Sequence, residues 1–105
     1  MTYKPSPSEK DLFKIISLIE SEEQAGKFLR DLLTEAEIKE FSNRWKVAQM
    51  LDKKIAYKTI AKETGMSSTT IARIQKWLTN GMKGYTTMLT KIKSTNSNVA
   101  HHLPT

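Results

Sequence analysis

Apolar residues recur every three or four positions along most of this chain, which is the spacing of amphipathic helices. Two such stripes lie in the first third, in helices predicted over about residues 9–20 and 22–33. The stripes consist of Leu12, Ile15, Ile16 and Ile19, followed by Phe28, Leu29, Leu32 and Leu33. An extended lead-in is expected over residues 3–8, which contain two prolines. No segment alternates with the period of a half-buried strand, so the pattern predicts an all-helical fold.

Capping residues indicate where the next helices begin. Ser21 fits the N-cap of the second helix, and Thr34 with Glu37 three residues later forms a capping box for a third. This third helix is expected to end near residues 53–54, where two lysines suit a helix C-terminus. Its predicted apolar stripe consists of Ile38, Phe41, Trp45, Ala48 and Leu51.

Two short helices follow, over about residues 57–64 and 68–78, with the spacing of a helix-turn-helix. Gly65 lies where the backbone must turn sharply, and Ala61 four residues earlier lets the second helix cross closely. Ser67 fits the N-cap of the second helix. The wedge between the two helices is expected to be filled by Ile60, Met66, Ile71 and Ile74.

A last helix is expected after the break at Asn80–Gly81, and the chain then ends in a polar tail. The apolar positions of this helix are Tyr85, Met88, Leu89 and Ile92. Residues 94–105 offer little apolar surface to bury, so disorder is expected there. The pattern therefore predicts about six helices in a single domain over residues 1–93, with the helix-turn-helix at about 57–78.

The net charge of +6 is distributed unevenly along the chain. Residues 1–44 hold seven Lys and Arg against nine Asp and Glu, a net of −2. Residues 45–105 hold ten against two, a net of +8. A one-sided basic field favours polyanions, nucleic acid above all, although a lysine-rich solvated surface is the simpler interpretation of charge alone.

The outer face of the helix predicted over residues 68–78 carries small, hydroxyl and cationic side chains. On a helical wheel, Thr69, Ala72, Arg73 and Lys76 lie opposite Ile71, Ile74 and Leu78. Such a face suits the major groove, where small residues permit close approach and arginine pairs with guanine. Lys58 and Lys62 on the preceding helix are placed for phosphate contacts. The alternative is an ordinary helical hairpin with a solvated lysine face, in which Arg73 pairs with an acid such as Glu63.

The sequence lacks the residues that several classes of protein function require. The chain has no cysteine, which excludes disulfides and thiolate zinc sites. No catalytic constellation is visible, because the two histidines, His101 and His102, lie in the tail without spaced partners for a nucleophile or a metal. No cofactor motif, apolar membrane span or secretory signal is present, so a cytoplasmic protein that is not an enzyme is expected.

The segment from Leu33 to Tyr85 resembles the tryptophan repressor superfamily, in particular its Trp-repressor-like bacterial branch. The resemblance is carried by the Leu-Thr-x-x-Glu helix start, by Arg44 and by the Thr-Ile-x-Arg core at Thr70, Ile71 and Arg73. It implies an intertwined homodimer whose two helix-turn-helix units enter successive major grooves of a near-palindromic operator in double-stranded DNA. The residues it implies at the DNA are Ser67, Ser68, Thr69, Thr70 and Arg73, with Lys58 on the preceding helix.

The best-known member of this family requires bound tryptophan, and the resemblance places a possible effector pocket at Arg44, Arg73, Ile74 and Trp77. The two arginines match residues that flank the indole ring in that member. Ile74 replaces a glycine and Trp77 a serine there, and their bulk fills the space the ligand would need. L-tryptophan is therefore not expected to be the effector. From its position alone, Arg44 is more typical of a salt bridge on the helix face.

The leading interpretation is a sequence-specific transcriptional regulator, a repressor that acts as a homodimer. Two alternatives stay open: a helical protein–protein interaction module, and a non-specific architectural DNA binder. Trp45 and Trp77, at helical spacing beside apolar residues, favour core or dimer contacts over base stacking.

Overall fold

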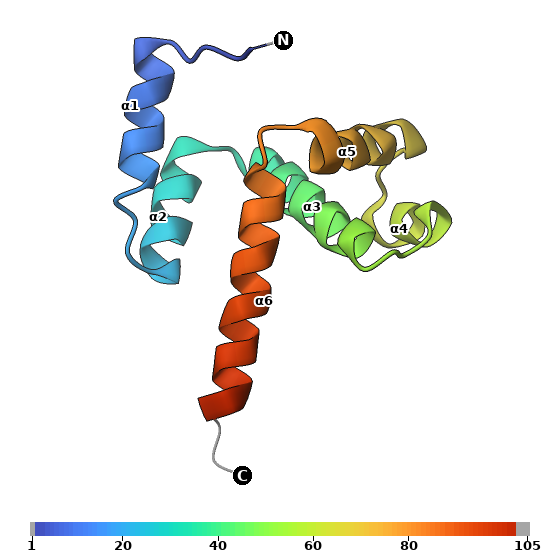
Figure 1. Cartoon of the computed structure of the whole chain (residues 1–105). Coiled ribbons are helices and arrows are strands. Elements are labelled where there is room, and N and C mark those ends of the chain that lie inside the picture. Colours follow the sequence, from blue (N-terminus) through green and yellow to red (C-terminus); the bar gives the residue numbers. More distant parts are fainter. Residues whose placement is uncertain (1, 103–105) are drawn as a thin grey trace. The chain divides into compact units, whose positions relative to one another are not determined.

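The computed structural model describes the backbone of residues 2–102 and the side chains of residues 2–95. This part of the chain contains six α-helices and no strand, so the all-helical prediction is confirmed (Figure 1). The helices are α1 (Pro7–Ile16), α2 (Glu22–Leu32), α3 (Glu35–Asp52), α4 (Tyr57–Thr64), α5 (Ser68–Asn80) and α6 (Gly84–His102). Two compact units divide the chain, Met1–Ile38 and Lys39–Thr105, with α3 running through the division. Each unit is described separately below.

In the first unit, α1 begins earlier than the sequence pattern predicts. Ser6 is the N-cap, its hydroxyl accepts from the Glu9 backbone N–H at 3.1 Å, and the Glu9 carboxylate accepts from the Ser6 N–H at 2.9 Å. Pro7 is the first helical residue. The expected lead-in over residues 3–8 is therefore too long, because a proline at this position lacks only an N–H that the helix would leave unpaired. The helix also ends earlier, at Ile16 rather than Glu20.

The helix α2 begins as expected after Ser21, whose hydroxyl accepts from the Gln24 N–H at 3.1 Å. Neither α1 nor α2 contains a buried residue. Ile15 of α1 and Phe28 of α2, with Leu18 and Ile19 between the helices, instead line an open groove of about 370 Å³ within this unit. The first unit therefore has no closed hydrophobic core of its own.

The capping box at the start of α3 is confirmed. The Thr34 hydroxyl accepts from the Glu37 N–H at 3.1 Å, and the Glu37 carboxylate accepts from the Thr34 N–H at 2.9 Å. The stripe predicted for this helix is only partly right. Its buried residues are Val47, Ala48, Met50 and Leu51, whereas Phe41 remains 48% exposed and Trp45 is half-buried. The core covers both sides of the C-terminal half of α3 and leaves its first turns uncovered.

The core of the second unit forms where α3, α4 and α5 meet. Ile60, Ile71 and Ile74 are fully buried together with Val47 and Ala48 of α3. Leu89 of α6 is 6% exposed. Burying an aliphatic side chain of this size contributes roughly 1.5–3 kcal/mol, so these residues hold the two short helices against α3.

The helix α6 begins after a short turn and is fixed to α3 near its start. Lys83 in the turn has a positive φ of 68°. The rings of Trp45 and Tyr85 stack with centroids 6.3 Å apart, and Lys93 pairs with Asp52 at 2.7 Å. The helix continues to His102, although we expected disorder from residue 94 onwards. Between 94 and 102 the sequence contains no glycine or proline, the residues that most strongly terminate helices.

Candidate nucleic-acid interface

The turn between α4 and α5 has the geometry that the sequence predicts. Gly65 adopts the left-handed conformation, with φ 74° and ψ 4°, and its N–H donates to the Ala61 carbonyl. Ser67 then caps α5 by accepting from the Thr70 N–H at 3.2 Å. A left-handed glycine followed by a capping serine ends one helix and starts the next within three residues, which makes this pair a tight helix-turn-helix.

The inner face of α5 is anchored in the core. Ile71 and Ile74 have no exposed surface, and Leu78 one turn later is half-buried against the same cluster. Met66 in the turn and Ala61 on α4 also pack there. These contacts fix the rotation of α5 about its own axis, which determines the residues it presents to solvent.

The outer face of α5 is open. Ser68, Thr69, Ala72, Arg73 and Lys76 are exposed. Arg73 forms no ion pair with any residue of the described part of the chain, so the alternative pairing with Glu63 is not seen. The Arg73 guanidinium therefore presents five hydrogen-bond donors, and the small side chain of Ala72 beside it lets a ligand come close to the helix.

Ser67 and Thr70 differ from the other predicted DNA contacts because they already have partners. The Ser67 hydroxyl accepts from the Thr70 backbone and lies 3.1 Å from the Thr70 hydroxyl. Thr70 is also half-buried. These two side chains hold the start of α5 in shape, whereas Thr69 between them is free to face a ligand.

Lys58 and Lys62 on α4 are both exposed. Ala56, at the N-cap of α4, provides no capping hydrogen bond from its side chain. The first backbone N–H groups of α4 therefore remain available beside Lys58. Free N–H groups next to a cation favour an anion such as phosphate at this end of the helix.

The charge around α4 and α5 is almost entirely positive. Residues 39–105 carry twelve Lys and Arg against three acids, Glu40, Asp52 and Glu63. Two of those acids are already paired, Glu40 with Arg44 at 3.3 Å and Asp52 with Lys93 at 2.7 Å. The unit therefore presents a basic surface with little internal neutralisation.

The residues of the effector pocket that the resemblance implies have different surroundings in the structure. Arg44 pairs with Glu40 and lies over the Phe41 ring at 5.8 Å, as expected for a salt bridge on the helix face. Ile74 is buried in the core, with no exposed surface. Trp77 is 40% exposed and lines a cavity.

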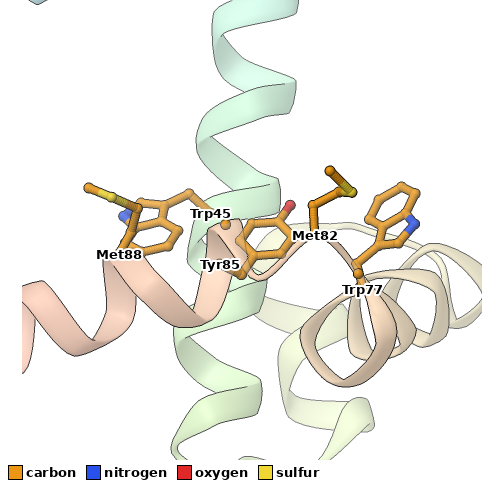
Figure 2. A pocket seen from close by; sticks show the side chains of 7 residues that line it. Trp45, Trp77, Met82, Tyr85 and Met88 are labelled. Carbon is orange, nitrogen blue, oxygen red and sulfur yellow. The ribbon is translucent and has the colours of Figure 1, made fainter. Parts of the chain in front are cut away.

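That cavity, of about 530 Å³, lies where α3, α5 and α6 meet (Figure 2). It is lined by Trp45, Trp77, Gly81, Met82, Gly84, Tyr85 and Met88. Burial in this surround raises the pKa of the Tyr85 hydroxyl, against a smaller lowering by the nearby Arg44 charge. The cavity was not predicted from the sequence, although the helical spacing of Tyr85 and Met88 already placed them on one face of α6.

The described part of the chain contains no cluster of three or more His, Cys, Asp or Glu able to hold a metal ion. The side chains of His101 and His102 lie outside the described residues. None of the helices searched there is long and apolar enough to cross a membrane.

A tight helix-turn-helix on a basic unit, with its second helix anchored inside and open outside, defines a DNA-binding fold. Residues 8–93 match the profile of the Trp repressor protein family. The chain belongs to this family, whose fold is a regulatory DNA-binding fold rather than that of an enzyme. The resemblance seen in the sequence is thereby confirmed.

Individual relatives agree with this assignment. The uncharacterised protein YerC of Bacillus subtilis is 35% identical over 86 residues, covering 82% of this chain and 83% of that protein. The crystal structure of a TrpR-like protein from Eubacterium eligens superposes with a TM-score of 0.79 at 32% identity, covering 84% of this chain and 91% of that one. A candidate Trp repressor from Staphylococcus aureus gives a TM-score of 0.78 at 34% identity, covering 85% and 89%.

Proposed function

We propose that this protein is a cytoplasmic transcriptional repressor that binds a near-palindromic operator as a homodimer. The observation that carries the proposal is the open face of α5, where Thr69, Ala72 and Arg73 are exposed while Ile71 and Ile74 behind them are fully buried. Membership of the Trp repressor family supports DNA as the partner.

We assign different roles to the exposed residues of the two helices. Arg73 reads a guanine by a bidentate contact. Thr69 and Ala72 let α5 come close to the major groove and contact a neighbouring base edge. Lys58, Lys62 and Lys76 contact phosphates, which position the protein without reading sequence. Ser68 lies at the first turn of α5, where its hydroxyl and the local backbone N–H groups suit a phosphate. Ser67 and Thr70 support the DNA contact by holding the cap.

A homodimer fits both the fold and the proposed operator. Two copies related by a two-fold axis present two recognition helices, and half-sites about one helical turn apart, roughly 34 Å, mirror that symmetry. The first unit, which buries none of the residues of α1 and α2, also leaves apolar surface for a second copy to cover.

The experiment that tests this function begins with selection of bound fragments from genomic DNA. One consensus with two related half-sites is the expected result. The affinity for that consensus and for random DNA is then measured over a salt series, because both decrease steeply with salt while only specific binding gives a large ratio between them. An equal affinity for both DNAs would indicate an architectural binder, and no binding would indicate an interaction module; either result would refute the proposal.

Three variants divide the proposed roles. Arg73→Ala should lower the affinity for the consensus by about 1–3 kcal/mol and reduce the ratio to random DNA. Lys58→Ala should weaken both DNAs about equally, since a phosphate contact carries no sequence information. Lys91→Ala, at an exposed lysine of α6 outside the helix-turn-helix, is the matched control and should change neither. A ratio that Arg73→Ala leaves unchanged would remove this residue from base recognition.

A further inference from the structure

Two lysines of the second unit adopt a backbone conformation that normally belongs to glycine. In the described backbone, the non-glycine residues with a positive φ are Lys54 at 62° and Lys83 at 68°. This left-handed conformation is strained for any residue with a Cβ. The turn between α4 and α5 needs the same conformation, and there the chain has a glycine, Gly65 at φ 74°. At positions 54 and 83, lysine is therefore less favourable for the backbone than glycine.

The hydrogen bonds around Lys54 explain its conformation but not its side chain. The Ile55 N–H donates to the Met50 carbonyl at 3.1 Å, and the Lys54 N–H donates to the Leu51 carbonyl at 3.0 Å. These two bonds form the Schellman motif that ends α3, in which the left-handed position is usually glycine. A cation near a helix C-terminus is favourable, but Lys53 already provides one without a positive φ. The end of α3 thus requires a left-handed residue at position 54, and it does not require a second lysine.

The ammonium group of Lys54 is open to an external anion. Lys54 is exposed and forms no ion pair within the described part of the chain. Asp52, the nearest acid in the sequence, pairs instead with Lys93 of α6 at 2.7 Å. The next acid is Glu63, near the far end of α4. The positive charge at the turn between α3 and α4 is therefore not neutralised by its neighbours.

We propose that Lys54 contacts a DNA phosphate and extends the interface of the helix-turn-helix to the turn between α3 and α4. This turn lies on the side of the second unit where α5 begins, whereas the turn that contains Lys83 lies where α5 ends (Figure 1). In helix-turn-helix proteins the start of the second helix enters the groove and the first helix crosses the DNA backbone. Lys54 lies just before that first helix, α4. This inference rests on the DNA binding of the proposed function and adds a contact outside its two helices.

Lys54 and Lys58 are close enough to contact one stretch of the DNA backbone. They are four positions apart, so their Cα atoms are separated by at most about 14 Å. Phosphates of one strand follow each other about every 3.4 Å along the DNA axis. Two flexible ammonium groups at this separation can bind phosphates a few nucleotides apart. The strain at Lys54 is then tolerated because it places a cation where α4 meets the DNA.

Lys54→Gly tests the inference, because it should change stability and DNA binding in opposite directions. Glycine relieves the strain, so the midpoint of thermal unfolding should rise. The affinity for DNA should fall by roughly tenfold per protomer at about 0.1 M salt. The slope of log affinity against log salt concentration should decrease in magnitude by about one per protomer. The consensus and random DNA should be affected alike, since a phosphate contact carries no sequence information.

Two further variants serve as controls. Lys83→Gly removes the same charge and relieves the same strain, at the end of α5 away from the proposed contact. It should raise the thermal midpoint as Lys54→Gly does, but it should leave the affinity and the salt slope unchanged. Lys54→Arg keeps both the charge and the strained backbone, so the affinity and the salt slope should be retained.

Several results would overturn the inference while leaving the proposed function intact. The first is an affinity and a salt slope for the consensus that Lys54→Gly does not change. The second is an equal loss from Lys54→Gly and Lys83→Gly, which would indicate a general effect of net charge. A loss confined to the consensus would indicate base reading rather than a phosphate contact. A lower thermal midpoint for Lys54→Gly would show that the lysine is needed to end α3.

Failure of the proposed function gives a different result. A protein that binds consensus and random DNA equally would not be a sequence-specific repressor. If Lys54→Gly still reduced the salt slope of that binding and Lys83→Gly did not, the phosphate contact would stand. A protein that binds no DNA at any salt concentration would refute both proposals.

Discussion

Ile74 anchors α5 in the core of the second unit, and Ile74→Ala measures how much this contact contributes to stability. The side chain has no exposed surface and belongs to the same cluster as Val47, Ile60 and Ile71. Truncating a fully buried isoleucine typically costs 2–5 kcal/mol, through the lost transfer energy and the cavity that remains. Because Ile74 connects helices from three parts of the second unit, we expect about 3–4 kcal/mol.

Urea denaturation measures this effect through the midpoint, with the variant and the unchanged protein at the same concentration. Thr69→Ala is the matched control on the same helix, and as an exposed residue it should change stability by no more than about 0.5 kcal/mol. A cost below about 1 kcal/mol for Ile74→Ala would mean that the site collapses easily or was never filled. In that case the plugged pocket, and with it the exclusion of L-tryptophan, would lose its physical basis.

Three further expectations follow from the same structure. Gly65→Ala should destabilise the protein by about 1 kcal/mol, because the φ of 74° is strained for alanine even though no atom lies within 4 Å of the new Cβ. Lys83→Gly should raise stability in thermal unfolding, because Lys83 has a φ of 68° that glycine adopts without strain. The backbone hydrogen bond from Thr34 lowers the pKa of Glu37. The ionised carboxylate therefore stabilises the fold above pH 4.5, the ordinary pKa of this group, and this stability is lost as the pH falls through the folded-state pKa. Glu37→Gln should reduce the loss of stability at acidic pH, measured by denaturation over a pH series. Calorimetry with millimolar L-tryptophan should give no saturable heat, because Ile74 fills the site; one site per chain with tighter operator binding would contradict this.

The features that could be predicted from the sequence are those fixed by neighbours three or four residues apart. The caps at Ser21, Thr34 and Ser67 and the left-handed Gly65 all involve local hydrogen bonds or a single backbone conformation. For the same reason α4 was predicted with its observed bounds, since the Gly65 turn ends it and the next cap begins within three residues. Local chemistry of this kind needs no knowledge of the rest of the molecule.

Burial was harder to predict because it depends on which elements meet in space. The periodicity of α3 placed Phe41 and Ala48 on one stripe, but only the half of the helix that contains Ala48 is covered. The cavity brings Trp45 together with Met88, 43 positions later in the chain, and no local pattern links them. The start of α1 was missed for a different reason: Pro7 was interpreted as a helix breaker, whereas at the first position it favours the helix.

The two halves of α5 are packed differently. Ile71 and Ile74 anchor its first half within the core of a single chain, so the rotation that exposes Arg73 is built in and needs no ligand. Trp77 and the Gly81 cap border an open cavity, so the second half of α5 has fewer buried contacts than the first half. Because Ile74 is part of this core, we expect L-tryptophan to exert no control over α5, since a ligand shifts an equilibrium only by its different affinity for the two states.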